Sequence, residues 1–84
     1  MSNNGQFIVS GNTRVECEFP CPKCGGKVKG IYKIKSESHA DETAVCDKCS
    51  ESYDVTVMTN DGTGTIDVPA LGIDQSAVKA QGLP

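Results

Sequence analysis

The sequence predicts a small all-β domain in which antiparallel strands are joined by two cysteine knuckles, each a tight Cys-x-x-Cys turn. The first observation behind this is that the two Cys-x-x-Cys pairs enclose a segment of alternating lysine and apolar residues. The second is that the chain of 84 residues has only 5% aromatic residues and no Trp. A core of this size stabilises a fold by only about 3–5 kcal/mol, so a further staple is expected.

Short segments that alternate between apolar and polar residues are predicted to be strands: 6–9, 14–19, 27–35 and 52–58. The first two are expected to form an N-terminal β-hairpin, and the polar segment 36–42 is expected to be a loop. Cys17 lies in phase with the apolar positions of its strand, so it is expected to be a small buried side chain. His39 lies in the polar loop and is expected to be solvated.

The two ends of the chain are predicted to pack loosely. Residues 1–5 have nothing to bury and are expected to be disordered. After turn residues at 60–64, segment 59–84 is expected to be a loosely attached tail, in which Asp74 caps a short helix at 75–81. The ordered β domain is therefore expected to span 6–58.

Four cysteines form the pattern C-x2-C-x21-C-x2-C: Cys21, Cys24, Cys46 and Cys49. Two tight turns at this spacing present four thiolates at the corners of a tetrahedron, the arrangement of structural zinc sites. Gly25 follows the first pair and suits the positive φ with which the chain leaves such a turn. Ser50 stands at the matching place of the second pair, where we expect either a strained left-handed conformation or a variant turn.

One structural Zn²⁺ is the metal that this pattern favours, and its binding would contribute an apparent 10–16 kcal/mol, roughly, at neutral pH. Iron in a rubredoxin-like site is an alternative, although rubredoxins surround the metal with aromatics and usually repeat a CPxCG-type second knuckle, which here reads CDKCS. Disulfides are a third interpretation. The odd count of five cysteines and the lack of a signal peptide argue against them.

A basic face is predicted on the segment between the knuckles: Lys27, Lys29, Lys33 and Lys35, with apolar Ile31 exposed among them. These lysines would prevent edge-to-edge strand pairing, contact an acidic protein, or follow nucleic-acid phosphates. Acidic residues between 37 and 54 are expected to pair with them. The net charge of −3 argues against direct nucleic-acid binding, because binders of nucleic acid carry a basic footprint over a whole domain.

Residues 19–58 resemble a zinc ribbon, and more narrowly the small zinc-ribbon transcription elongation factors of eukaryotes and archaea. The shared features follow one order along the chain: Phe19, Cys21-Pro22-Lys23-Cys24, Cys46 to Cys49, Ser52-Tyr53, Ile66-Asp67-Val68 and Ile73-Asp74. The resemblance implies that the four cysteines bind the metal and that the ribbon docks onto RNA polymerase or its chromatin template. The chain lacks the basic N-terminal tail that is typical of this family.

A noncatalytic, zinc-stabilised adaptor that binds a larger protein or protein–nucleic acid complex is the function that these observations favour, with a transcription complex as the leading case. An enzyme is not expected, because no catalytic motif or phosphate loop is present. The alternative is an acidic, antitoxin-like inhibitor that acts through apolar tail residues: Ile66, Val68, Leu71 and Ile73. No apolar run exceeds three residues, so we expect no membrane partner and a cytoplasmic location, or a nuclear one in a eukaryote.

Overall fold

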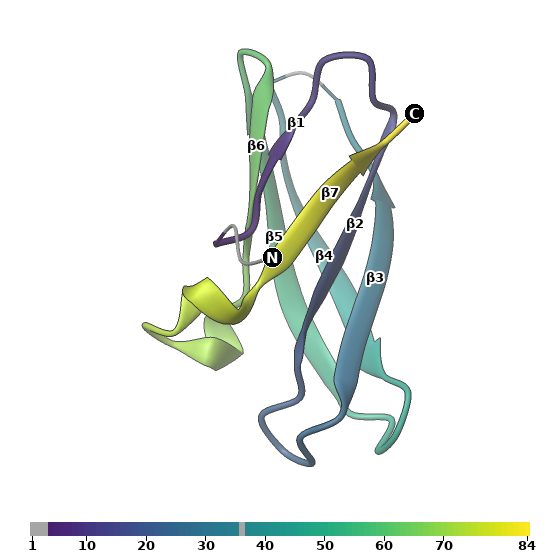
Figure 1. Cartoon of the computed structure of the whole chain (residues 1–84), viewed down its shortest axis with the longest axis vertical. Coiled ribbons are helices and arrows are strands. Elements are labelled where there is room, and N and C mark those ends of the chain that lie inside the picture. Colours follow the sequence, from purple (N-terminus) through teal and green to yellow (C-terminus); the bar gives the residue numbers. More distant parts are fainter. Residues whose placement is uncertain (1–3, 36) are drawn as a thin grey trace.

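The computed structural model describes residues 4–35 and 37–84, which form an antiparallel β structure with two short 3-10 turns (Figure 1). In chain order the elements are β1 (Gln6–Ile8), β2 (Arg14–Pro20), β3 (Lys27–Lys33), β4 (His39–Cys46), β5 (Ser52–Asn60), β6 (Thr63–Asp67), η1 (Pro69–Leu71), η2 (Gln75–Ala77) and β7 (Lys79–Leu83). The strands make one sheet in the order β1-β6-β5-β4-β3-β2-β7. In the described ranges no helix has the length and apolarity to cross a membrane.

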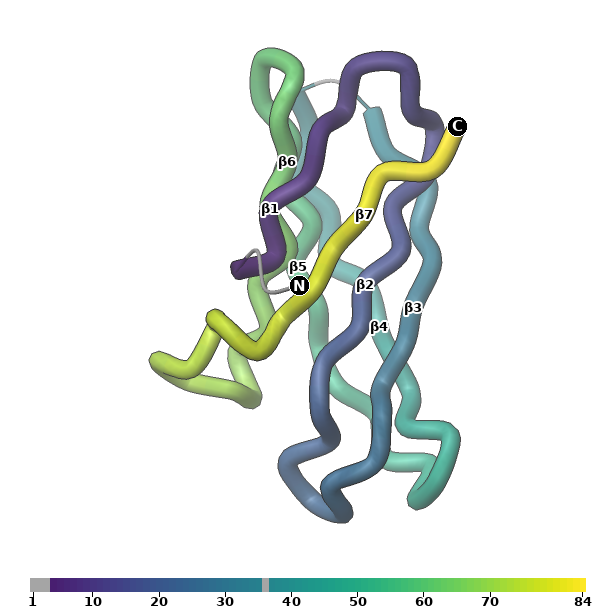
Figure 2. The backbone as a smooth tube through the Cα atoms, in the orientation of Figure 1, coloured from purple at the N-terminus to yellow at the C-terminus, as the bar shows by residue number. Residues whose placement is uncertain are grey.

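The sheet curls until its two edge strands, β1 and β7, lie side by side (Figure 2). The Gly5 amide donates a hydrogen bond to the Val78 carbonyl at 3.0 Å. The Asn12 side-chain amide donates to the Ile8 carbonyl at 2.7 Å, and a Cβ on Gly82 would overlap both of those groups. The Gly5–Val78 bond and the close approach of Gly82 to the Ile8 carbonyl bring the edges together, so the fold is a barrel-like sheet rather than an open ribbon.

Apolar side chains that alternate along the strands fill the inside of the barrel. Those that are almost completely buried are Val15, Cys17, Phe19, Val28, Val55, Val57, Ile66, Val68 and Val78. This confirms the prediction that Cys17 is a small buried residue, since its exposed fraction is 0%. The all-β class predicted from the alternating segments is confirmed as well.

Two glycines lie beneath aromatic rings on the inner face. A Cβ on Gly30 would overlap the phenol of Tyr32, and a Cβ on Gly64 would overlap the ring of Phe7, its partner across β1 and β6. Because glycine has no Cβ, each aromatic ring can lie against the backbone of a strand. The ring then fills the space beside that glycine in the core.

The predicted N-terminal hairpin is wrong, although its two strands exist. β1 pairs with β6, and β2 pairs with β3 and β7. The connection at 9–13 crosses one end of the barrel instead of turning back on itself. The physical reason is that Phe7 packs on Gly64, a glycine far along the chain, and this contact sets the register of β1.

The polar segment predicted as a loop at 36–42 is largely strand β4. Residue 36 lies outside the described residues, but from His39 onward the chain pairs with β5 along its whole length. Its polar side chains alternate with small inward ones such as Ala40 and Ala44, a pattern with too few apolar residues to indicate a strand.

The predicted loose tail is also wrong. Its residues form β6 and β7, and Ile66 and Val68 are buried in the core. The helix predicted at 75–81 is a three-residue 3-10 turn followed by a strand, and the Asp74 side chain makes no capping bond. Of residues 1–5, the first three lie outside the described residues, whereas Gly5 is hydrogen-bonded to both Val78 and Ile66.

Truncation after Asn60 should therefore unfold the protein rather than remove an appendage. The deletion takes away β6 and β7, and it exposes the apolar inner faces of β1, β2 and β5. We expect the truncated chain to lose dispersed amide signals in NMR spectra and cooperative thermal unfolding. Substitution Ile73→Ser is the control, because this fully exposed side chain should be replaceable without loss of either property. A truncated chain that keeps native dispersion would contradict the barrel.

Candidate metal centre

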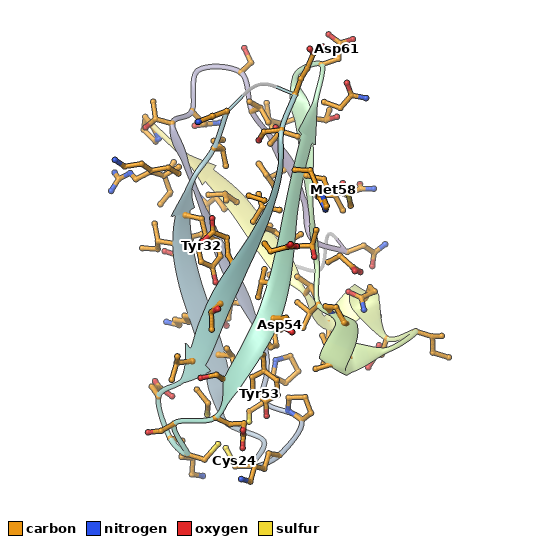
Figure 3. All side chains as sticks on the ribbon, turned by 180° about the vertical axis from the view of Figure 1, so that it is seen from behind. Cys24, Tyr32, Tyr53, Asp54, Met58 and Asp61 are labelled. Atoms are coloured by element: carbon orange, nitrogen blue, oxygen red, sulfur yellow. The ribbon has the colours of Figure 1, made fainter. Side chains whose placement is uncertain are left out.

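The cysteine quartet, defined as Cys21, Cys24, Cys46 and Cys49, lies at one end of the barrel, in the β2–β3 and β4–β5 connections (Figure 3). The four Sγ atoms all lie within 4.8 Å of one another. Sγ–Sγ distances across the knuckles are 3.7 Å for Cys21 and Cys49 and 3.5 Å for Cys24 and Cys46. A tetrahedral site with metal–sulfur bonds of about 2.3 Å has edges of about 3.8 Å, so the quartet matches the size of a four-sulfur metal site.

The two knuckles have the same backbone geometry. In the first, the Gly25 amide donates to the Cys21 carbonyl at 2.9 Å, and in the second the Ser50 amide donates to the Cys46 carbonyl at 3.0 Å. Gly25 has a φ of 76°, which confirms the conformation predicted there, and Ser50 has a φ of 62°, so the second knuckle adopts the left-handed conformation rather than a variant turn. Ser50 adopts it despite its Cβ, which costs about 1–2 kcal/mol.

Backbone amides also point at the sulfurs. The Gly26 amide donates to Cys24 Sγ and the Lys48 amide to Cys46 Sγ, both at 3.4 Å. A Cβ on Gly26 would lie 3.1 Å from the Lys48 Cβ and 3.3 Å from Cys24 Sγ. The glycine therefore allows the two knuckles to approach closely, a requirement that the spacing of cysteines alone does not reveal.

Tyr53, on β5, is a site residue that the sequence prediction missed. Its hydroxyl lies 3.2 Å from Cys21 Sγ, and its ring packs edge-on against Phe19 at a centroid distance of 6.0 Å. Burial raises the pKa of Cys21. Hydrogen bonds from the Tyr53 hydroxyl and from the Cys24 and Lys23 amides lower this pKa by more, so that it falls to about 6. The Tyr53 hydroxyl therefore favours the thiolate, the form that binds metal. Its signal in the sequence was only an inward position on the strand after the second knuckle.

The pKa values of Cys46 and Cys49 are shifted in opposite directions. The amides of Cys49 and Lys48 lower the pKa of Cys46. The Glu51 amide lowers the pKa of Cys49, but burial and the neighbouring thiols raise it more, to about 12. Cys21 and Cys46 therefore favour the thiolate whereas Cys49 resists ionising beside them, and a cation among the sulfurs would stabilise the thiolate of Cys49.

The lysines of the knuckles differ in their surroundings. The Lys23 ammonium contacts the Glu51 carboxylate at 2.8 Å, and Glu51, followed by Cys49 and Cys21, raises the pKa of Lys23. Lys48 instead packs its stem on Gly26. Lys23 is therefore the knuckle lysine whose ammonium is influenced by two of the sulfurs, those of Cys49 and Cys21.

The predicted basic face lies on the outside of β3 and the residues after it. Lys27, Lys29, Ile31, Lys33 and Lys35 are all exposed, and Ile31 is 55% exposed. The prediction that acidic residues between 37 and 54 pair with these lysines is wrong for Lys27 and Lys29, which form ion pairs with a different residue.

That partner is Glu18, on the neighbouring strand β2. Its carboxylate lies 3.4 Å from the Lys27 ammonium and 4.0 Å from that of Lys29. The two lysines nearest the knuckles are therefore partly neutralised, whereas Lys33 lies opposite Arg14. The positive charge of the face is concentrated toward the end of β3 that is farther from the cysteine quartet.

The remaining candidate residues lie apart from the quartet. Cys17 is buried in the barrel, where burial raises its pKa, and His39 is exposed at the start of β4. In the part of the chain that is described, neither belongs to a group of potential metal ligands. Of the apolar tail residues, Ile73 is fully exposed, and Leu71 is half-buried beside the core.

A small antiparallel barrel with a four-cysteine candidate metal centre is the class of protein that the fold and site define. No family model, curated protein or solved structure matches the chain.

Substitution Tyr53→Phe should weaken metal binding by about tenfold, because outer hydrogen bonds to ligands typically contribute 10- to 100-fold, roughly, to affinity. Competition with a chromophoric chelator measures this change. Tyr32→Phe is the matched control: its hydroxyl donates to the Thr43 carbonyl, away from the quartet, so it should alter stability but not metal affinity. Equal affinities for the wild type and Tyr53→Phe would mean that the Tyr53–Cys21 contact does not support the ligand.

Proposed function

We propose that the cysteine quartet binds one structural Zn²⁺. The supporting observation is the pair of cross-knuckle Sγ distances, 3.5 and 3.7 Å, in a site where amides and a tyrosine hydroxyl already favour thiolates. Iron would accept the same four sulfurs. We favour zinc because the second knuckle, CDKCS, departs from the rubredoxin pattern and few aromatic residues are present to shield a redox centre. Cys21, Cys24, Cys46 and Cys49 would be the ligands.

We further propose that the protein is a noncatalytic binding module for a larger macromolecular partner. A four-sulfur zinc site has no open position for a substrate, so the metal would hold the structure rather than perform chemistry. The observation that carries the binding function is the exposed face of β3, where Ile31 lies among lysines. An apolar side chain within a charged face is typical of a contact surface, although single exposed apolar residues are common.

The partner that we propose is a protein or a protein–nucleic acid assembly. The resemblance to zinc-ribbon elongation factors implies that this partner is a transcription complex. The net charge of −3, which four thiolates with Zn²⁺ would make more negative, disfavours binding to nucleic acid alone.

An acidic inhibitor is the second candidate, and one observation favours it. Ile73 lies on a loop that Gln75 braces, because the Gln75 side chain accepts from the Val68 amide at 3.0 Å and donates to the Val68 carbonyl at 2.8 Å. A fully exposed isoleucine on a braced loop suits insertion into a pocket of a target enzyme.

The zinc proposal predicts one equivalent of zinc per chain, measured by elemental analysis of protein purified without added metal. Cys24→Ser should lose the metal and unfold the knuckle end, because the site loses one of four ligands. Cys17→Ala should keep one equivalent, since this thiol is buried away from the quartet. Iron in place of zinc, or a chelated protein that keeps its native NMR spectrum, would refute the proposal.

The binding proposal predicts that reversing the charge of Lys29 and Lys33 abolishes partner capture. Tagged, zinc-loaded protein would be used to capture partners from lysate of the source organism, with and without nuclease, and read by mass spectrometry. The triple variant Lys79→Glu, Gln6→Glu and Asn60→Asp, at exposed positions away from both the quartet and the basic face, changes the net charge equally and should retain the partner. Ile73→Ser tests the inhibitor alternative in the same experiment. If the Lys29→Glu, Lys33→Glu variant still captures the partner but the Ile73→Ser variant does not, the loop is the contact surface and the basic face is not.

A further inference from the structure

A groove lies on the outside of the barrel, between the first knuckle and the turn that leads into β7. Its volume is about 330 Å³, and its walls are mainly apolar, supplied by Phe19, Pro20, Gly25 and Ala77. A Cβ on Gly25 would meet nothing within 4 Å, so the groove is open to solvent on that side. A groove of this size has room for an apolar side chain from another molecule.

Two lysines also line this groove, and they differ in what they contact. The Lys27 ammonium lies 3.4 Å from the Glu18 carboxylate. Lys79 stands across from Glu18 in the β2–β7 register, but its ammonium forms no ion pair with any residue that the structure describes. Lys79 therefore places an unpaired positive charge beside the apolar walls.

The loop that ends at Ala77 carries an exposed isoleucine beside the groove. Ile73 is fully exposed, more so than any other large apolar side chain of the described residues. In Figure 1 this loop, at 68–78, projects from the side of the barrel. Because its whole side chain is exposed, Ile73 does not occupy the groove of its own chain.

Hydrogen bonds on both sides of Ile73 hold the loop in shape. The Asp74 amide donates to the Leu71 carbonyl at 3.0 Å. The Gln75 side chain donates to the Gly72 carbonyl at 2.7 Å. A contact made by Ile73 would therefore require little ordering of the loop, which lowers the entropic cost of binding.

Asp74 gives the exposed isoleucine an acidic neighbour. Its carboxylate accepts from the Ser76 hydroxyl at 3.0 Å, and it forms no ion pair with a described residue. The loop thus presents an apolar side chain followed by a negative charge, whereas the groove presents apolar walls beside the positive charge of Lys79. The loop and the groove are complementary in both respects.

We propose that Ile73 docks into the groove of a second copy of the chain, where Asp74 would lie beside Lys79 of that copy. Because the loop and the groove adjoin on each chain, the contact is reciprocal, and two copies form a closed dimer about a twofold axis. Both exposed isoleucines would then be removed from water. Self-association at this surface goes beyond the proposed binding function.

Sedimentation of the purified, zinc-loaded protein tests this proposal, over concentrations from about 1 μM to about 1 mM. We expect a monomer–dimer equilibrium. Ile73→Ser should raise the dimer dissociation constant about a hundredfold, because each of the two reciprocal contacts loses about tenfold. Ile8→Ser is the matched control, since this isoleucine is 61% exposed but lies on β1. It should dimerise as the wild type does.

An exchange of charge between copies tests which groups meet. Asp74→Lys and Lys79→Glu should each weaken the homodimer, because each places like charges together at both contacts. A labelled Lys79→Glu chain should nevertheless bind the Asp74→Lys chain, since every contact between these two variants joins a lysine to an acidic residue. Asp54→Lys is the control partner: it has the same net charge as Asp74→Lys but is altered on the outer face of β5. It should bind the labelled chain at least about tenfold more weakly.

The dimer is refuted by a monomer over the whole concentration range, by a dimer that Ile73→Ser leaves intact, or by equal binding of the labelled chain to the Asp74→Lys and Asp54→Lys chains. Native NMR spectra of each variant show that unfolding is not the cause. These experiments use the purified chain alone, so their failure is distinct from failure of the proposed binding function. That function is tested through Lys29 and Lys33, and neither of them lines the groove.

Discussion

The cysteine quartet joins two halves of the sheet that otherwise have little contact on that side. One half consists of β7, β2 and β3, and the other of β4, β5, β6 and β1. The first half supplies Cys21 and Cys24, and the second supplies Cys46 and Cys49. On this side the described parts of the two halves share two backbone-paired residue pairs, both beside the knuckles, and the side-chain bonds of Tyr32 to Thr43 and of Thr59 to Lys35. A metal held by all four sulfurs would therefore link the two halves of the barrel. Its removal would weaken the contact between β3 and β4 at the end that carries the knuckles.

The opposite side of the barrel is closed by the chain itself. The Gly5 amide bonds to the Val78 carbonyl near one end of the β1–β7 contact, and Gly82 lies close against the Ile8 carbonyl near the other. A domain with so few aromatic residues has little apolar area to bury, so it depends on such closure and on the quartet. Two aromatic rings that lie over glycines add apolar packing on opposite sides of the barrel. Tyr32 packs over Gly30 beside the gap between β3 and β4, and Phe7 packs over Gly64 from edge strand β1.

The features of the site that depend on local sequence could be predicted, and those that depend on distant contacts could not. The cysteine spacing and the glycine after the first pair encode the knuckle geometry within a few residues, so the quartet and the left-handed conformation of Gly25 were predictable, whereas that of Ser50 was left open. The role of Tyr53 depends on which strand faces Cys21, a tertiary fact that its position in the sequence does not contain. Strand β4 was missed because its inward residues are small and its outward residues polar, so burial comes from the neighbouring strand β5.

The C-terminal residues were misjudged for a related reason. Val78 and Ala80 alternate over too short a segment to outweigh a helical pattern that begins at Asp74, and β7 forms because β2 offers a free edge. Once β7 covers that edge, β2 is paired on both sides, and unpaired backbone in the described sheet remains on the facing edges of β1 and β7 and between β3 and β4 beyond Lys29. Exposed edges favour aggregation unless charge limits what can pair with them. Lys29 and Lys33 impose that limit on β3, because their exposed positive charges disfavour pairing with another basic strand.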